Sequence, residues 1–96
     1  MIRPRRTKRD ANQGEVVDGL RALGASVWDL ADVGGTAADL MVCWRGRCRW
    51  VEVKQPGKER DLTDGERDCL WLCAQVGVTM IVATCVEDVI SAWEGA

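Results

Sequence analysis

The chain has 96 residues, 47% of them hydrophobic, which suits one small globular domain and argues against wholesale disorder. No apolar run approaches the roughly 20 residues that span a bilayer, and no signal-peptide segment opens the chain, so we expect a cytoplasmic protein with no membrane partner. The absence of histidine and tyrosine excludes Ser-His-Asp and Cys-His catalysis, His-ligated zinc and a phosphotyrosyl intermediate, and leaves carboxylates and lysine as the obvious catalytic groups.

Positive charge is concentrated in residues 1–9, which we treat as an N-terminal arm ahead of one domain at 10–96. Without the five basic residues of this arm, the net charge falls from −2 to −7. The arm suits contacts with nucleic-acid phosphates, although a merely solvated tail is the alternative. Its basic residues are Arg3, Arg5, Arg6, Lys8 and Arg9.

Residues 12–24 have apolar side chains at helical spacing and predict the first helix. Asp10 or Asn12 can cap this helix, and Gly24 can end it. Glu15 lies in its first turn, where a capping or solvated role is the default for an acid. A strand is expected at 26–30, followed by a loop.

Two apolar runs flank Arg45-Gly46, and the pattern predicts a β-hairpin with its turn at these two residues. In a symmetric register, the numbers of cross-strand partners sum to 91, so Asp39 lies opposite Glu52 and Lys54 follows on the same face. Carboxylates about 5 Å apart repel by about 3 kcal/mol at an effective dielectric of about 20. A divalent cation would remove this repulsion, whereas the alternative is a surface charge cluster that Lys54 neutralises.

Both faces of the hairpin carry apolar side chains, as central strands covered by helices on each side do: Leu40, Val42, Val51 and Val53 on one face, and Met41, Cys43, Cys48 and Trp50 on the other. Cys43 and Cys48 fall opposite each other and could form a disulfide under oxidation. Cys69 and Cys73 are one helical turn apart, which also suits a metal site. In a chain without a secretion signal, we nevertheless expect the five cysteines to be reduced and to pack as small hydrophobic side chains.

The remainder of the chain predicts an exposed loop, a helix, a strand and a final helix. The loop covers 55–61, and Thr63 with Glu66 forms a capping box before a helix that ends near residue 75. The apolar surface of this helix comes from Leu70, Trp71, Leu72 and Ala74. Residues 78–83 are a β-rich apolar run. Thr84 and Glu87 predict a second capping box before a short helix through residue 93. The predicted order is αβββαβα.

An acid, a short hairpin and then Glu-Val-Lys, in this order of elements, resemble the core of the PD-(D/E)XK nucleases. The brevity of the chain and the residues around Leu62-Thr63 look most like the stand-alone VRR-NUC type, which is similar to Holliday-junction-resolving enzymes. The resemblance covers residues 10–93. It implies an α/β fold, a restriction-endonuclease-like core in which helices flank a central mixed sheet.

The resemblance also implies roles for individual residues. Asp39 and Glu52 match the metal-binding acids, and the carbonyl of Val53 would be a further ligand. Lys54 matches the catalytic lysine. Glu15 matches the first-helix glutamate that supports the metal, directly or through water.

Three features depart from the family pattern. Ala38 replaces the proline that often precedes the aspartate, and proline there has no chemical task. Glu66 stands where many relatives have glutamine, so its part in the site is left open. The Val-Arg-Arg string that names the type is not evident.

We therefore expect a Mg²⁺- or Mn²⁺-dependent endodeoxyribonuclease that cuts branched DNA or Holliday junctions as a homodimer. The alternatives are a nicking or restriction-type nuclease of the same fold, a catalytically silent nucleic-acid-binding module, and a structural protein with an incidental charge cluster. Five tryptophans exceed what so small a core needs, and one or two of them are candidates for a dimer surface. They are Trp28, Trp44, Trp50, Trp71 and Trp93.

Overall fold

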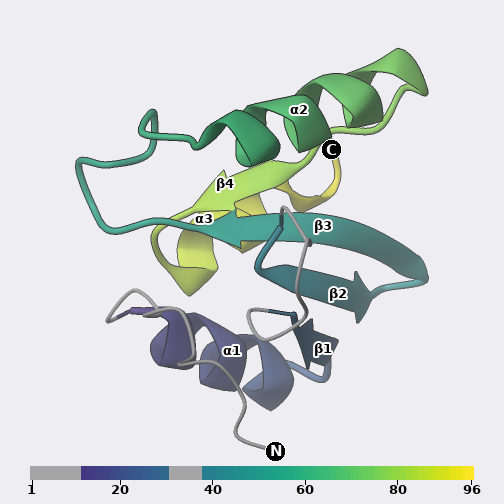
Figure 1. The fold of residues 1–96 in the computed structure, drawn as a ribbon. Coiled ribbons are helices and arrows are strands. Elements are labelled where there is room, and N and C mark those ends of the chain that lie inside the picture. The colour runs from purple at the N-terminus through teal and green to yellow at the C-terminus, as the bar shows by residue number, and fades with distance from the viewer. Residues whose placement is uncertain (1–11, 31–37) are drawn as a thin grey trace, which may run out of the picture.

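A computed structural model describes residues 12–30 and 38–96 of the chain; the predicted basic arm lies outside these ranges. Within the described residues, three helices and four strands follow one another in the predicted order αβββαβα (Figure 1). None of the described helices is long and apolar enough to cross a membrane. The elements are α1 (Gln13–Ala22), β1 (Ser26–Asp29), β2 (Leu40–Trp44), β3 (Arg47–Val53), α2 (Asp64–Gln75), β4 (Ile81–Ala83) and α3 (Val86–Trp93).

The strands form one mixed sheet in the order β1-β2-β3-β4. β1, β2 and β3 are antiparallel to their neighbours, whereas β4 runs parallel to β3. The parallel pair requires a crossover between its two strands, and α2 supplies it. The architecture is therefore α/β, as the sequence predicted.

The hairpin of β2 and β3 has the predicted register, since Leu40 pairs with Val51 and Cys43 pairs with Cys48. Its turn lies at Arg45 and Gly46, with φ of 51° and 77°. Positive φ at both central residues is typical of a type I′ turn, whose twist matches that of the flanking strands. Because side chains alternate along a strand, this register decides which residues share a face.

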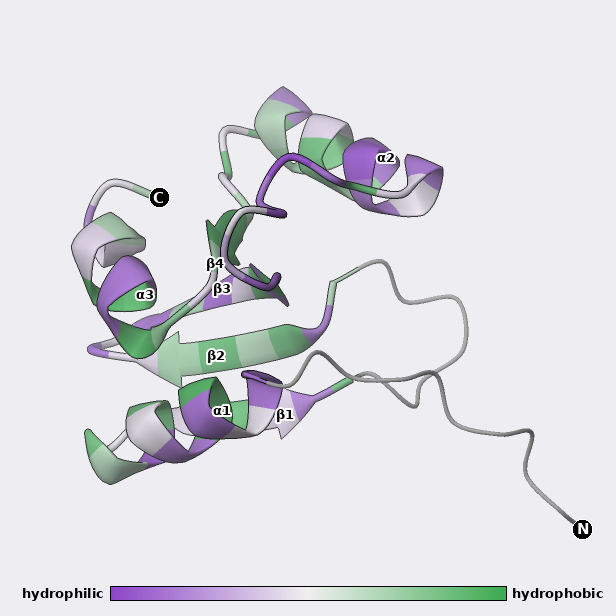
Figure 2. Ribbon diagram, turned by 90° about the vertical axis from the view of Figure 1, so that its left-hand side faces the viewer, coloured by the Kyte–Doolittle hydropathy of each residue, from purple (hydrophilic) through white to green (hydrophobic). Residues whose placement is uncertain are grey.

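One face of the sheet forms the core, against α1 and α3. The side chains of Leu40, Val42, Val51 and Val53 on this face are at most 1% exposed. Figure 2 shows α1 and α3 together on this side of the sheet and α2 on the other side. Trp93 of α3 is fully buried, and hydrophobic residues from all four strands and from α1 and α3 join in one cluster.

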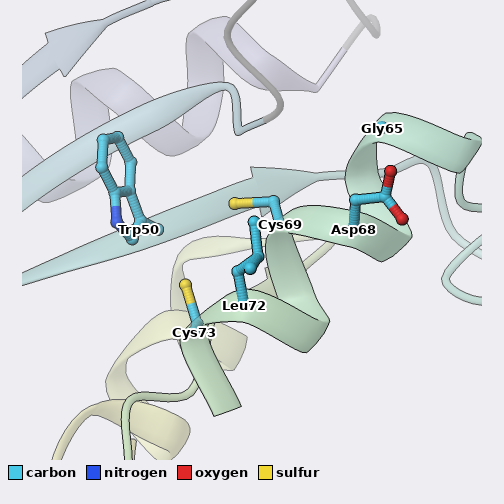
Figure 3. A pocket seen from close by; sticks show the side chains of 6 residues that line it. All are labelled: Trp50, Gly65, Asp68, Cys69, Leu72 and Cys73. Atoms are coloured by element: carbon cyan, nitrogen blue, oxygen red, sulfur yellow. The ribbon is translucent and has the colours of Figure 1, made fainter. Parts of the chain in front are cut away.

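The other face is covered less completely than the sequence predicted. α2 lies across from Trp50 but has no buried residue of its own. A pocket of about 420 Å³ separates the helix from the Trp50 ring and is lined on the helix side by Cys69, Leu72 and Cys73 (Figure 3). Trp71 and Leu72 were expected to supply apolar packing surface, yet they are 62% and 59% exposed.

Cys43 and Cys48 form a disulfide, so the expectation that all five cysteines are reduced is wrong at this pair. Their position explains the bond. In this hairpin Trp44 and Arg47 form the pair that closes the turn, and the next pair along is of the non-hydrogen-bonded kind, in which side chains approach most closely. Cys69, Cys73 and Cys85 are free thiols.

The predicted capping box of Thr84 and Glu87 is also wrong. α3 begins after Cys85, which makes no side-chain cap. Thr84 instead donates from its backbone N–H and from its hydroxyl to Oδ2 of Asp88, both at 2.9 Å. These two bonds lower the pKa of Asp88, which takes the place that the prediction gave to Glu87 as the partner of Thr84. By contrast, the capping box of Thr63 and Glu66 at α2 is confirmed.

Candidate active site

Asp39 and Glu52 come together at the open end of the hairpin. Asp39 directly precedes β2, and its Oδ2 accepts a hydrogen bond of 2.9 Å from the N–H of Val53. Its carbonyl accepts a second one, of 2.7 Å, from the N–H of Leu30 after β1. Leu40 pairs with Val51, so the next positions along the two strands, Asp39 and Glu52, lie opposite each other, as the sequence predicted.

Glu52 is a buried acid with an unsatisfied oxygen. It is 2% exposed, and its Oε1 has no hydrogen-bond partner among the described residues. Burial, hydrogen bonding with Glu66 and the negative charge of Asp39 raise the pKa of Glu52 to about 10. Without a cation this carboxyl is therefore uncharged at neutral pH. A buried oxygen without a partner is costly, and a bound cation would satisfy it.

Lys54 reaches the same place from the end of β3. Its Nζ lies 2.9 Å from Oε1 of Glu66 and 3.8 Å from Oε2 of Glu52. The side chains of all three residues are at most 15% exposed, so solvent screens these contacts weakly. The Lys54 ammonium thus lies between the carboxyls of Glu52 and Glu66.

Glu66, whose part the sequence left open, belongs to this cluster. Its Oε1 accepts from the N–H of Thr63 at 2.8 Å in the capping box and also from Lys54. Burial opposes ionisation, but hydrogen bonds with Glu52 and Lys54 outweigh it and lower the pKa of Glu66. Glu66 is thus the ionised partner of Lys54, whereas burial favours the protonated form of Glu52.

Asn12 is a residue of the site that the sequence reasoning missed. Its Nδ2 donates to the carbonyls of Lys54 at 2.8 Å and Thr84 at 2.5 Å instead of capping α1. The N–H of Lys54 also donates to the carbonyl of Ala83 in β4, at 2.8 Å. α1 and β4 therefore hold the backbone that carries the lysine. An asparagine before a helix reads as a cap in the sequence, so no local signal distinguishes the two roles.

Glu15 lies in the first turn of α1 with its side chain exposed. Its support of a metal stays a prediction, as do the phosphate contacts of the basic arm outside the described residues.

The donors at the hairpin end suit a hard cation. Asp39, Glu52 and the Val53 carbonyl would offer oxygen ligands, and Glu52 Oε1 is buried without a partner in the described parts of the chain. Residues 12–30 and 38–96 contain no group of three or more acidic or cysteine side chains close enough to hold a metal ion. Mg²⁺ usually binds through one or two carboxylates and keeps several waters, so two carboxylates suffice for it. The residues present therefore fit Mg²⁺ or Mn²⁺.

Comparisons with protein-family models, with curated proteins and with solved structures found no match. The resemblance to a nuclease family therefore stays a prediction from the sequence.

Proposed function

We propose that this chain is a Mg²⁺- or Mn²⁺-dependent endodeoxyribonuclease with a PD-(D/E)XK core. One observation carries the proposal: the hairpin register brings Asp39 beside Glu52 and sets the Lys54 ammonium 3.8 Å from the Glu52 carboxyl. A buried glutamate beside an aspartate and a lysine is a costly arrangement for a structural protein, because Glu52 must hold a proton and the ammonium needs a counterion. They are a useful one for phosphodiester hydrolysis.

Each residue has a distinct task in this reaction. Asp39, Glu52 and the Val53 carbonyl would hold the cation, which supplies positive charge to the phosphate oxygens when bound. Lys54 donates hydrogen bonds to the same phosphate group and stabilises the charge that develops in the transition state. Glu66 and Asn12 position Lys54, the first through its ammonium and the second through its backbone carbonyl. Water adds across the P–O3′ bond, and the products are a 5′-phosphate and a 3′-hydroxyl, as the resemblance implies.

Branched DNA is the proposed substrate, cut by a homodimer whose two sites would be spaced by the interface. Support for DNA comes from the basic arm in the sequence, and the half-exposed Trp28 and Trp71 offer surface for a second copy. Light scattering at micromolar concentration tests the dimer, and a monomer there contradicts it.

Cleavage of a synthetic four-way junction and of a linear duplex, with Mg²⁺, Mn²⁺ or EDTA, tests the activity. We expect metal-dependent cutting that favours the junction and that Glu52→Gln abolishes. Glu59→Gln is the matched control, because Glu59 is an exposed acid in the loop after β3. The nuclease proposal fails if neither DNA is cut with either metal, or if Glu52→Gln cuts as fast as the wild type.

A further inference from the structure

The loop between β3 and α2 is built from two consecutive turns that meet at Lys58. The N–H of Lys58 donates to the carbonyl of Gln55, and the N–H of Asp61 donates to the carbonyl of Lys58, both at 2.9 Å. Gly57 provides the positive φ, of 86°, that the first turn requires. The backbone of Lys58 is thus held by hydrogen bonds on both sides, although the loop is exposed.

These turns enclose a hollow of about 320 Å³ beside the candidate active site. Its lining residues are Lys54, Gln55, Lys58 and Asp61. Lys54 therefore faces two neighbouring places: the cluster with Glu52 and Glu66 on one side, and this hollow on the other. A ligand in the hollow would lie next to any group that reacts at Lys54.

The two lysines of the hollow differ in how their charge is balanced. Lys54 has Glu66 at 2.9 Å, whereas Lys58 makes no ion pair in the described parts of the chain. A single uncompensated ammonium, an amide donor from Gln55 and a nearby carboxylate from Asp61 suit an anion with one negative charge. A phosphodiester carries one charge, whereas Asp61 disfavours a free phosphate dianion.

We infer that this hollow is a subsite for a backbone phosphate of nucleic acid adjacent to the phosphate that is cut, with the Lys58 ammonium and the Gln55 amide as its donors. The inference rests on the proposed nuclease function and adds a substrate contact to it. Lys58 binds the strand and has no part in the chemical step, so its loss weakens binding and leaves the site at Lys54 intact.

Fluorescence anisotropy with a labelled DNA duplex in EDTA, between 50 and 200 mM NaCl, tests the subsite. One lost phosphate contact lowers the slope of log K against log salt by about 0.9 and weakens binding about 8-fold at about 0.1 M salt. We expect both effects in Lys58→Ala and neither in Lys58→Arg. Gln55→Ala should weaken binding without changing the slope, because an amide releases no counterion.

Arg60→Ala is the matched control, since Arg60 is an exposed cation of the same loop that does not line the hollow. The inference is overturned if Lys58→Ala has the wild-type slope, or if Arg60→Ala lowers the slope equally. Wild-type cleavage with Mg²⁺ reports separately on the proposed function: if it persists while the Lys58→Ala slope is unchanged, only the subsite fails.

Discussion

Glu52→Gln is expected to stabilise the metal-free protein at neutral pH while it abolishes cleavage. Glu52 is 2% exposed, and burial together with Glu66 and Asp39 raises its pKa to about 10. The ordinary value is 4.5, so the folded protein binds one more proton than the unfolded chain between these two pH values. The contribution of Glu52 to the free energy of unfolding is therefore greatest below pH 4.5 and declines as the pH rises towards 10.

At pH 7 the expected gain in unfolding free energy is the same for any pKa of folded Glu52 well above 7, because the group is then fully protonated in the folded protein. Glu52 is ionised in the unfolded chain, where its pKa is 4.5, and must take up a proton on folding. At pH 7 this costs about 3 kcal/mol, at 1.36 kcal/mol for each pH unit above 4.5. Glutamine has a similar shape, can donate to Glu66 and carries no such cost. In a domain of this size, about 3 kcal/mol raises the melting temperature by on the order of 10 °C or more.

Thermal unfolding of both proteins in EDTA, at pH 4.5, 6, 7 and 8, measures the difference. We expect it to be absent at pH 4.5 and to grow with pH. Addition of Mg²⁺ should stabilise the wild type by mass action and leave the stability of Glu52→Gln unchanged. The difference in melting temperature between the two proteins should therefore become smaller. A Glu52→Gln protein that is less stable than the wild type at every pH in EDTA would refute the account of a buried, uncharged Glu52.

Three further changes test other parts of the structure. Lys54→Ala should lower the cleavage rate at least about 100-fold, because the transition state loses one hydrogen-bond donor. The affinity for the junction, measured by fluorescence anisotropy, should change little. Normal cleavage would show that Lys54 has no part in the mechanism. Reduction of the Cys43–Cys48 disulfide, or its replacement by Cys43→Ser with Cys48→Ser, should lower the free energy of unfolding by only about 2 kcal/mol in a denaturant titration, because the bond closes a short loop. The control Cys85→Ser changes a free thiol and should show the same loss of stability on reduction as the wild type. Equal stability with and without reductant would show that the bond contributes nothing. Asn12→Ala should lower the free energy of unfolding in urea by about 1–3 kcal/mol, because the carbonyls of Lys54 and Thr84 lose a donor. A loss below about 1 kcal/mol, which is typical of a helix cap alone, would contradict the role of Asn12 in joining the ends of β3 and β4.

The features that the sequence predicted well are those set by local periodicity. The hairpin register follows from counting residues on each side of Arg45-Gly46, and the pairing of Asp39 with Glu52 follows from the register. The contact of Glu66 with Lys54 could not be derived in this way, because it depends on where the loop after β3 delivers α2. Thr84 was assigned to the wrong partner because two acids, at 87 and 88, compete for it and their spacing alone does not decide between them.

The exposure of α2 could not be predicted because apolar residues at helical spacing indicate a face without showing what covers it. Trp71 and Leu72 read as packing residues, yet the chain itself leaves them exposed. The sequence identified Cys43 and Cys48 as a possible disulfide pair, but the expected reduced state was wrong because it was judged from the expected compartment and not from the geometry of the pair.

The hairpin separates its two ends in a way that matters for engineering. The turn at Arg45 and Gly46 is exposed, whereas the acids lie at the opposite end of β2 and β3, beyond the disulfide. A loop grafted between Arg45 and Gly46 would leave every pairing on the acid side of Cys43 and Cys48 unchanged. One residue inserted between Cys48 and Glu52 would instead turn the Glu52 side chain to the core face. The turn is therefore the place to attach a fluorophore, an affinity tag or a second DNA-binding module without altering the site.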